Sequence, residues 1–214
     1  MVNSTSDYEV ELRLVANREG KFFPCVKLYT CEDKRFSYRR NSIAASIHPS
    51  TAALIMELAE PYLKERAQVM DPFCGVGTML IERAQKGAVH DVYGTDIFGE
   101  AIEKARENTR LAGMDFNYIH RDFFDFSHAY RFDEMISNLP VRGKKTKEQM
   151  EGLLDRFFQK AEELLTEDAI LVLYTNEGVL LKQALQKHGK FKLLEQMKIQ
   201  TKGEYELMII GAKG

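Results

Sequence analysis

The segment 69–78, with the sequence Val-Met-Asp-Pro-Phe-Cys-Gly-Val-Gly-Thr, constrains the fold of this chain more than any other. An apolar run ends at Asp71, and two glycines one residue apart, Gly75 and Gly77, follow it. Glycine lets the backbone turn sharply and lets a ligand lie against main-chain atoms where a Cβ would intrude. The run 78–86 then has helical spacing. The segment therefore predicts a buried strand, a tight turn and a helix that together hold a nucleotide-like ligand.

The residues around this turn favour a cationic ligand over a pyrophosphate. A dinucleotide-binding motif has a third glycine three residues after the second, where this chain has Leu80. The carboxylate of Asp71 would repel a pyrophosphate but attract the amino or sulfonium group of S-adenosylmethionine. A second carboxylate, Asp96, ends the next predicted strand, 91–96, where an acid can accept hydrogen bonds from ribose hydroxyls.

Length and composition limit the classes of function. With 214 residues, 44% of them hydrophobic, the chain is long enough for one substantial core. The formal net charge of -2 excludes a strongly basic surface over the whole molecule, so nucleic-acid binding must be local or supplied by another domain or chain. The three cysteines form no CxxC pair, so we expect no metal site and a reducing, cytoplasmic environment. No apolar run has spanning length and no signal pattern occurs, so we expect neither membrane insertion nor export.

The N-terminal region predicts an extension, residues 1–45, ahead of a catalytic domain at residues 46–214. Residues 1–7 have the composition of a disordered end. Apolar residues alternate from residue 10 and again over 22–29, with a turn signal between them, which is typical of a β-hairpin. Basic residues between positions 18 and 40 outnumber acidic ones, so this region could follow a phosphate backbone; ordinary surface charge explains it equally well.

The end of the chain decides between two nucleotide-binding folds. Strands and helices alternate from residue 46 onward, which predicts an α/β fold with a largely parallel sheet. The last two predicted strands, 191–200 and 204–212, are too close in sequence for a crossover helix, so they must form an antiparallel hairpin. This favours the Rossmann-like class I methyltransferase fold, with a mixed seven-stranded sheet and an antiparallel last strand, over an all-parallel nicotinamide-binding fold.

Polar residues end four consecutive predicted strands: Asp71, Asp96, Asp122 and Asn138. Because ligands of such sheets bind beyond the carboxyl ends of the strands, we expect these side chains to lie close together. Asp122 could accept a hydrogen bond from an adenine amine while Ile97 and Phe123 pack on the adenine faces. The structural alternative is that aspartates at strand ends cap the following helices.

The sequence Asn138-Leu139-Pro140 indicates a rigid turn. Its side-chain and backbone oxygens would accept hydrogen bonds from an exocyclic amine and hold the nitrogen in line with a methyl group, so that catalysis is chiefly positioning. An ordinary strand-ending turn is the alternative, since asparagine and proline both favour turns. His48, which precedes Pro49, is a tempting general base, but a helix-entry role is the stronger interpretation.

Several motifs together resemble the methyltransferase domain of THUMP-associated RNA guanine-N2 methyltransferases. They are residues 38–40, 47–49, 71–78 with 80–82, and 138–140. The resemblance implies S-adenosylmethionine as methyl donor and a guanine amine in tRNA or rRNA as acceptor. The cofactor-binding residues it implies are Asp71, Phe73, Cys74, Gly75, Gly77, Thr78, Asp96, Ile97, Asp122, Phe123 and Asn138, and the catalytic residues are Asn138, Leu139 and Pro140.

The chain departs from this family in two ways. Leu139 and Val141 stand where the family motif has a second proline and an aromatic residue that stacks on the flipped base. The THUMP domain that captures RNA in the family has no room in this chain, so either the chain is cut from a longer protein or RNA is held differently. The cations just after the turn, at positions 142, 144, 145 and 147, are candidates for phosphate contact, and a solvated loop explains them equally well.

We therefore predict an S-adenosylmethionine-dependent RNA methyltransferase whose leading acceptor is a guanine amine. One alternative is a catalytically weak scaffold module with a cofactor-binding fold in an RNA-processing assembly. Another is a methyltransferase that acts on a protein or a small molecule.

Overall fold

The computed structural model describes residues 10–28, 34–44, 46–200 and 203–213. By its contacts the chain divides into two compact units, Met1–Phe36 and Ser37–Gly214. The disorder predicted for residues 1–7 lies outside the described residues. No helix in the described ranges combines the length and the apolar character needed to cross a membrane.

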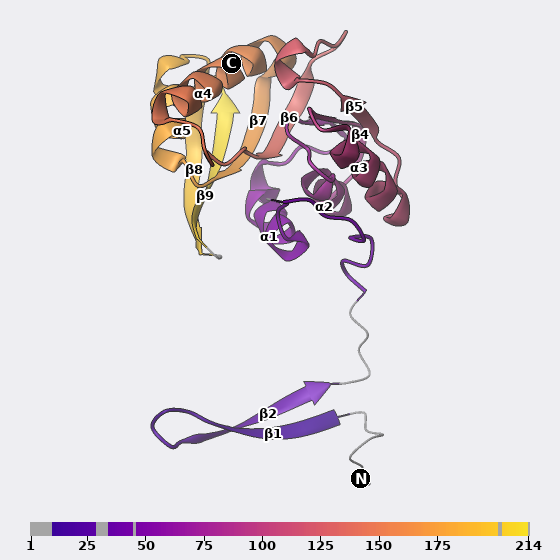
Figure 1. The fold of residues 1–214 in the computed structure, drawn as a ribbon, viewed down its shortest axis with the longest axis vertical. Coiled ribbons are helices and arrows are strands. Elements are labelled where there is room, and N and C mark those ends of the chain that lie inside the picture. Colours follow the sequence, from indigo (N-terminus) through magenta and orange to yellow (C-terminus); the bar gives the residue numbers. More distant parts are fainter. Residues whose placement is uncertain (1–9, 29–33, 45, 201–202, 214) are drawn as a thin grey trace. The chain divides into compact units, whose positions relative to one another are not determined.

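The second unit contains a seven-stranded sheet with the strand order β5-β4-β3-β6-β7-β9-β8 (Figure 1). Its strands are β3 Ala67–Asp71, β4 Val89–Asp96, β5 Asn117–His120, β6 Phe132–Asn138, β7 Leu165–Thr175, β8 Phe191–Gln200 and β9 Glu204–Ala212. The first five in spatial order pair in parallel, while β9 runs antiparallel to both β7 and β8. The prediction of a mixed sheet with an antiparallel end is confirmed.

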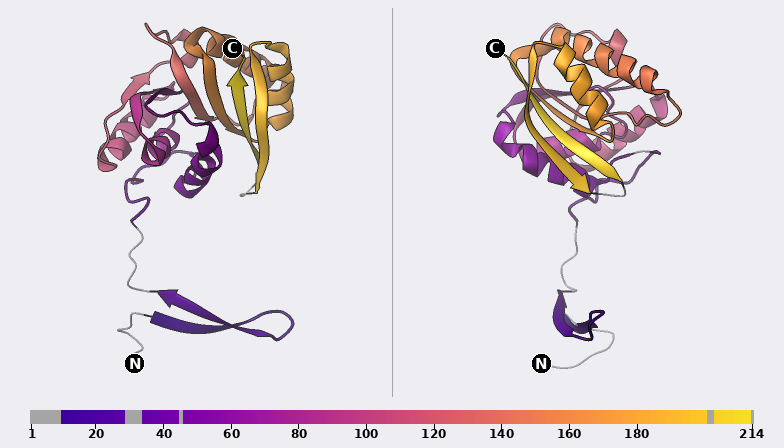
Figure 2. Two further views of the ribbon diagram at one scale, coloured as in Figure 1. Left: turned by 180° about the vertical axis from the view of Figure 1, so that it is seen from behind. Right: turned by 90° about the vertical axis from the view of Figure 1, so that its left-hand side faces the viewer.

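Helices cover both faces of this sheet (Figure 2). They are α1 Pro49–Ala59, α2 Thr78–Lys86, α3 Gly99–Leu111, α4 Lys147–Leu164 and α5 Gly178–Lys187, with short 3-10 turns η1 Glu60–Tyr62 and η2 Phe123–Asp125. Apolar side chains of α4 and α5 form one buried cluster with the sheet, and those of α1, α2 and α3 form a second cluster on the other face. Burial on both faces explains the continuous apolar run 169–174 within the central strand β7.

Two predicted element bounds shift for local reasons. The sequence predicts a helix with Pro49 in its first turn and an apolar-periodic run from 52 to 63. The helix α1 does begin at Pro49, but a 3-10 turn replaces its end at Pro61, which lacks the N–H that a helix interior requires. The third strand was expected to reach Asp122, but β5 ends at His120 because Asp122 caps η2 and accepts a hydrogen bond from the Phe124 N–H.

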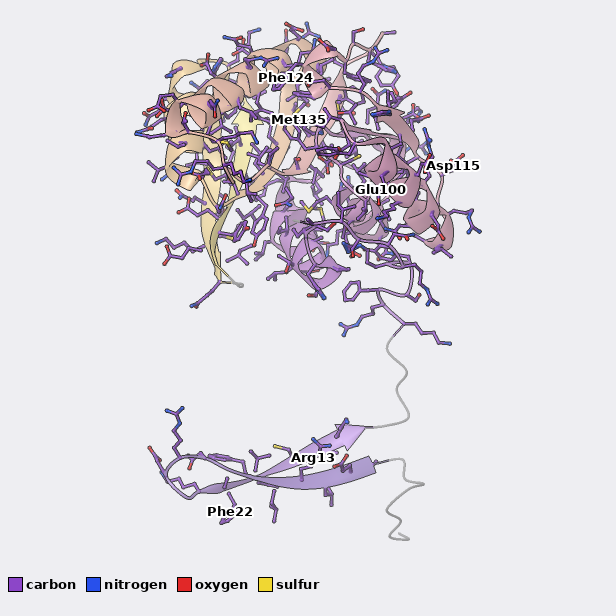
Figure 3. The ribbon with its side chains drawn as sticks, in the orientation of Figure 1. Arg13, Phe22, Glu100, Asp115, Phe124 and Met135 are labelled. Atoms are coloured by element: carbon purple, nitrogen blue, oxygen red, sulfur yellow. The ribbon has the colours of Figure 1, made fainter. Side chains whose placement is uncertain are left out.

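The first unit contains the predicted hairpin, formed by β1 Val10–Ala16 and β2 Phe22–Leu28. Its register pairs Leu12 with Val26 and Ala16 with Phe22. Directly opposed residues share a face, so these apolar side chains lie together on one face, while Arg13, from the alternate positions, lies on the other (Figure 3).

The segment just after residue 36 belongs to the second unit. Tyr38 is buried and its hydroxyl donates to Glu82 of α2 at 2.5 Å, while the Asn41 N–H donates to Asn108 of α3 at 3.0 Å. Burial raises the pKa of Tyr38 well above its ordinary value. Arg39 is half-buried, and burial lowers its pKa, so it is not one of the solvated cations that the sequence suggested. The contacts therefore divide the chain earlier than the sequence boundary after residue 45.

Candidate active site

A cavity of about 490 Å³ opens where β3, β4 and β6 end. The predicted site residues that line it are Asp71, Phe73, Cys74, Gly75, Thr78, Asp96, Ile97, Asp122, Phe123, Asn138, Leu139 and Pro140. Parallel strands end at the same edge of a sheet, which is why residues distant in sequence meet there. The cavity brings together every predicted site residue except Gly77.

Three aspartates at this edge hold their turns in the same way. The carboxylates of Asp71, Asp96 and Asp122 each accept a hydrogen bond from the backbone N–H two residues later, at 3.0, 2.9 and 3.0 Å. Such local bonds are the structural role that aspartate commonly has at strand ends. Since all three side chains also line the cavity, the capping role and a ligand-binding role are compatible.

Asp96 ties two of the turns together. One of its oxygens accepts from the Phe98 N–H, and the other accepts from the Gly75 N–H at 2.9 Å. The glycine turn is therefore fixed to the end of β4. A carboxylate oxygen has a second lone pair, so Asp96 can still accept hydrogen bonds from a ligand hydroxyl.

Asp71 is a buried carboxylate with an unusual environment. Its Oδ1 accepts from Ser137 Oγ at 2.6 Å and from the Phe73 N–H, and the side chain is 1% exposed. Burial raises the pKa of Asp71 to about 7, although both hydrogen bonds act in the opposite direction. Asp96 adds a smaller electrostatic contribution that also raises this pKa. A cation bound nearby would stabilise the ionised form of Asp71.

Thr78 provides a test of whether the cavity fits a polar ligand. Its Oγ1 is buried and has no hydrogen-bond partner, and the residue lines the cavity at the start of α2. A buried hydroxyl without a partner costs free energy, which a ligand that supplies one recovers. The amino, hydroxyl and carboxylate groups of S-adenosylmethionine match the donors and acceptors that Asp71, Asp96 and Thr78 present, so the residues fit this cofactor.

Gly77 does not line the cavity. It adopts a left-handed φ of 82°, and an added Cβ would collide with the hydroxyl of Tyr118 in β5. The glycine is therefore required for the turn and for the close approach of α2 to the sheet. Gly77 is thus the one predicted cofactor-binding residue that the cavity lining does not include.

The turn after β6 is anchored to the neighbouring strand. Asn138 is paired in register with Tyr174 of β7, and the Leu139 N–H donates to the Tyr174 carbonyl at 2.9 Å. The side chain of Leu139 is only 2% exposed. The turn, whose residues 138–140 line the cavity, is therefore held in place by β7 and by the buried Leu139 side chain.

His48 has the structural role that the sequence favoured. It is the N-cap of α1: its Nδ1 accepts from the Ser50 N–H at 3.3 Å and lies 2.7 Å from the Ser50 hydroxyl. His48 does not line the cavity. No group of three or more histidine, cysteine, aspartate or glutamate side chains in the described ranges is arranged to hold a metal ion.

The cavity also contains residues that the sequence did not indicate as site residues. They are Ile43, Ala44, Ser46, Val76, Met79, Phe98, Phe124, Leu153, Arg156 and Tyr205. The Arg156 guanidinium lies 3.9 Å from the centre of the Phe124 ring, a cation–π contact between α4 and η2; Figure 3 labels Phe124. Ile47, from one of the family motifs, and Lys145, one of the candidate phosphate contacts, line it as well.

Comparison with curated proteins finds relatives that are RNA and protein methyltransferases. The chain is 30% identical over 129 residues to the tRNA (guanine(10)-N2)-dimethyltransferase of Methanothermobacter thermautotrophicus, covering 59% of this chain and 37% of that protein. It is 29% identical over 142 residues to the Bos taurus U6 snRNA (guanine-N(2))-methyltransferase THUMPD2, covering 62% and 26%. It is 28% identical over 140 residues to the ribosomal protein L11 methyltransferase of Thermotoga petrophila, covering 64% and 52%. The chain thus spans at most about half the length of these relatives.

The fold matches solved methyltransferase structures. TrmN from Thermus thermophilus superimposes with a TM-score of 0.76 at 24% identity, covering 99% of this chain and 62% of that one. Residues 37–206 match the family described as UPF0020, RMKL-like, methyltransferase domain. These findings agree with the resemblance that the sequence motifs predicted. The chain, with its class I fold and a cavity suited to S-adenosylmethionine, therefore belongs to the RMKL-like methyltransferase domain family.

Proposed function

We propose that this chain methylates the exocyclic N2 amine of a guanosine in RNA, with tRNA the first substrate to test. The single observation that carries the proposal is the cavity itself, in which the Asn138 turn and the three aspartates of β3, β4 and η2 meet. The curated names of two relatives, a tRNA guanine-N2 enzyme and an snRNA guanine-N2 enzyme, support a guanine amine as acceptor.

In this proposal the residues divide the work between two substrates. Asp71, Asp96 and Thr78 would hold S-adenosylmethionine, which supplies the electrophilic methyl group. The oxygen of the Asn138 side chain would accept a hydrogen bond from the acceptor amine and align its nitrogen, so the chain contributes mainly orientation. Asp122 and Phe123 would lie at the adenine, since Asp122 Oδ2 has no hydrogen bond to any described residue while Oδ1 caps η2.

The experiment is methylation of unmodified tRNA transcripts with isotopically labelled donor, followed by mass spectrometry of the nucleosides. We expect labelled N2-methylguanosine with the wild-type chain. The variant Asn138→Ala should lower kcat by at least about a hundredfold while calorimetry shows donor affinity within about twofold of wild type. Retained turnover in Asn138→Ala would remove this residue from the mechanism.

A protein acceptor is the second candidate, because one relative is named a ribosomal protein L11 methyltransferase. The same assay with ribosomal proteins in place of RNA distinguishes the two. Label in protein and none in RNA would reverse the assignment, and a chain that fails to bind S-adenosylmethionine would favour the scaffold alternative.

A further inference from the structure

The site contains an aromatic side chain that the family motif does not provide. Position 141, where the motif has an aromatic residue, is valine here. Tyr205, near the start of β9, lines the cavity and is partly exposed. We propose that Tyr205, backed by Tyr174, is the surface on which the acceptor base stacks; this inference rests on the proposed function.

The sheet register places Tyr205 on the same face as the catalytic turn. Asn138 pairs with Tyr174, and Tyr174 pairs with Leu207. Directly paired residues point to the same face of a sheet, and residues two apart in one strand do so as well. Tyr205 is two residues before Leu207, so Asn138, Tyr174 and Tyr205 share one face.

Contacts fix the plane of the Tyr205 ring. The rings of Tyr174 and Tyr205 are stacked, with centroids 4.7 Å apart and planes inclined by 13°. Tyr174 is only 3% exposed, and its carbonyl holds the Leu139 N–H of the catalytic turn. Tyr174 therefore connects the Tyr205 ring to the turn that would bind the amine. Because the Tyr205 side chain is already held in place, it loses little conformational freedom when a base binds.

The other aromatic residues of the cavity belong to a different part of it. Phe73 contacts Phe123 and Phe124 at ring-centroid distances of 5.8 and 6.5 Å, and it packs with the cluster that includes α4 on the opposite face of the sheet. Phe98 directly precedes α3 beside Asp96, the residue assigned to the donor ribose. These residues suit the adenine and ribose of the donor, which leaves Tyr205 for the acceptor.

The chemistry of this subsite favours a flat base with an exocyclic amine. Stacking on an aromatic ring is available to any base and contributes about 1–3 kcal/mol, a factor of roughly 5 to 150 in affinity. The Asn138 turn would select among bases by their amine. Its carbonyl oxygens can accept hydrogen bonds but cannot donate them, so they favour a base with an amine donor. Tyr205 would thus hold the base and Asn138 would identify its amine.

The test uses a short single-stranded RNA with one 2-aminopurine, a fluorescent base that carries its amine at the same carbon as guanine. Stacking on an aromatic ring quenches this fluorescence. With saturating S-adenosylhomocysteine, we expect the wild-type chain and Tyr205→Phe to quench the probe. Tyr205→Leu should raise the Kd of the probe by at least about fivefold.

Controls separate this subsite from misfolding and from the proposed function. Tyr62→Leu, a matched change at a tyrosine outside the cavity, should leave quenching unchanged. Calorimetric affinity for S-adenosylmethionine should be the same in Tyr205→Leu and wild type. Absence of quenching by wild type, or equal quenching by wild type and Tyr205→Leu, would overturn the subsite.

Methylation assays distinguish failure of the Tyr205 subsite from failure of the proposed function. If wild type forms N2-methylguanosine and Tyr205→Leu keeps the wild-type KM for RNA, the proposed function stands and the subsite is wrong. If quenching depends on Tyr205 but no RNA is methylated, the base-binding surface stands and the proposed reaction is wrong.

Discussion

At the scale of single residues, Asp71 is a buried carboxylate whose protonation depends on folding. Its folded-state pKa of about 7 lies above the ordinary value of 3.8. Between pH 3.8 and about pH 7, Asp71 is therefore protonated in the folded state but ionised in the unfolded chain. The contribution of protonated Asp71 to the free energy of unfolding is full below about pH 3.8 and is lost as pH rises through about 7.

We expect the affinity for S-adenosylmethionine to rise between pH 6 and 8, as Asp71 ionises and attracts the positively charged donor. Calorimetry in buffers of different ionisation enthalpy should also detect proton release on binding near pH 6.5. In Asp71→Asn both effects should disappear.

Asp115→Asn is the matched control, since Asp115 is exposed and does not line the cavity (Figure 3). It should keep the wild-type dependence on pH. A pH-independent affinity in the wild-type chain would contradict the assignment of a protonated Asp71.

At the scale of elements, the glycine turn joins β3 to α2 through backbone geometry. Gly77 and Gly113 have similar left-handed φ angles of 82° and 73°. An added Cβ would meet the Tyr118 hydroxyl at Gly77 but nothing within 4 Å at Gly113. A substitution at Gly113 therefore tests backbone strain alone, whereas one at Gly77 tests backbone strain together with a steric conflict.

Denaturant unfolding should show that Gly113→Ala costs about 1–2 kcal/mol, the strain of a left-handed residue with a Cβ. Gly77→Ala should cost more, because the Cβ also displaces Tyr118. The double variant Gly77→Ala/Tyr118→Phe should recover part of the difference, since phenylalanine lacks the colliding hydroxyl. Equal losses at both glycines would show that the Tyr118 contact is not limiting.

The elements also show which parts of the site are predictable from sequence. Asp71, Asp96 and Asn138 were predicted because each ends a predicted strand, a pattern that is local in sequence. Tyr205 was not predicted as a site residue. It begins a strand, and only the antiparallel placement of β9 beside β7 brings that beginning to the cavity. Arg156 was missed for a similar reason, since its position depends on how α4 packs.

Burial explains the remaining difference at the N-terminal boundary. Tyr38 and Arg39 look like members of a basic, solvated segment in the sequence. The Tyr38 partner, Glu82, is distant in sequence, and Arg39 reaches the Ile47 carbonyl, so only the folded chain shows that this segment is part of the second unit.

At the scale of the whole molecule, the division into two compact units suggests that the second unit is stable without the first. We propose that a chain starting at Ser37 folds on its own. Its Tm and its affinity for S-adenosylmethionine should match those of the full chain. A chain starting at Ser46, at the sequence boundary, should melt at least about 4 °C lower, because it lacks the Tyr38 and Asn41 hydrogen bonds.

Differential scanning calorimetry of both truncated chains checks this expectation. Tyr38→Phe in the full chain is the matched single change, since it removes the hydroxyl that reaches Glu82 and keeps the ring. Identical melting of the two truncated chains would place the folding boundary at residue 45 after all.

The reversed direction of β9 has a further consequence. Parallel strands bring only their final residues to the edge where ligands bind, whereas a reversed strand brings its first residues there. In our assignment the methyl donor is recognised by residues 71–123, and the acceptor is recognised by the Asn138 turn together with Tyr205 near the start of β9. On this assignment, substitutions near the start of β9 should change acceptor preference while the donor-binding residues are left as they are.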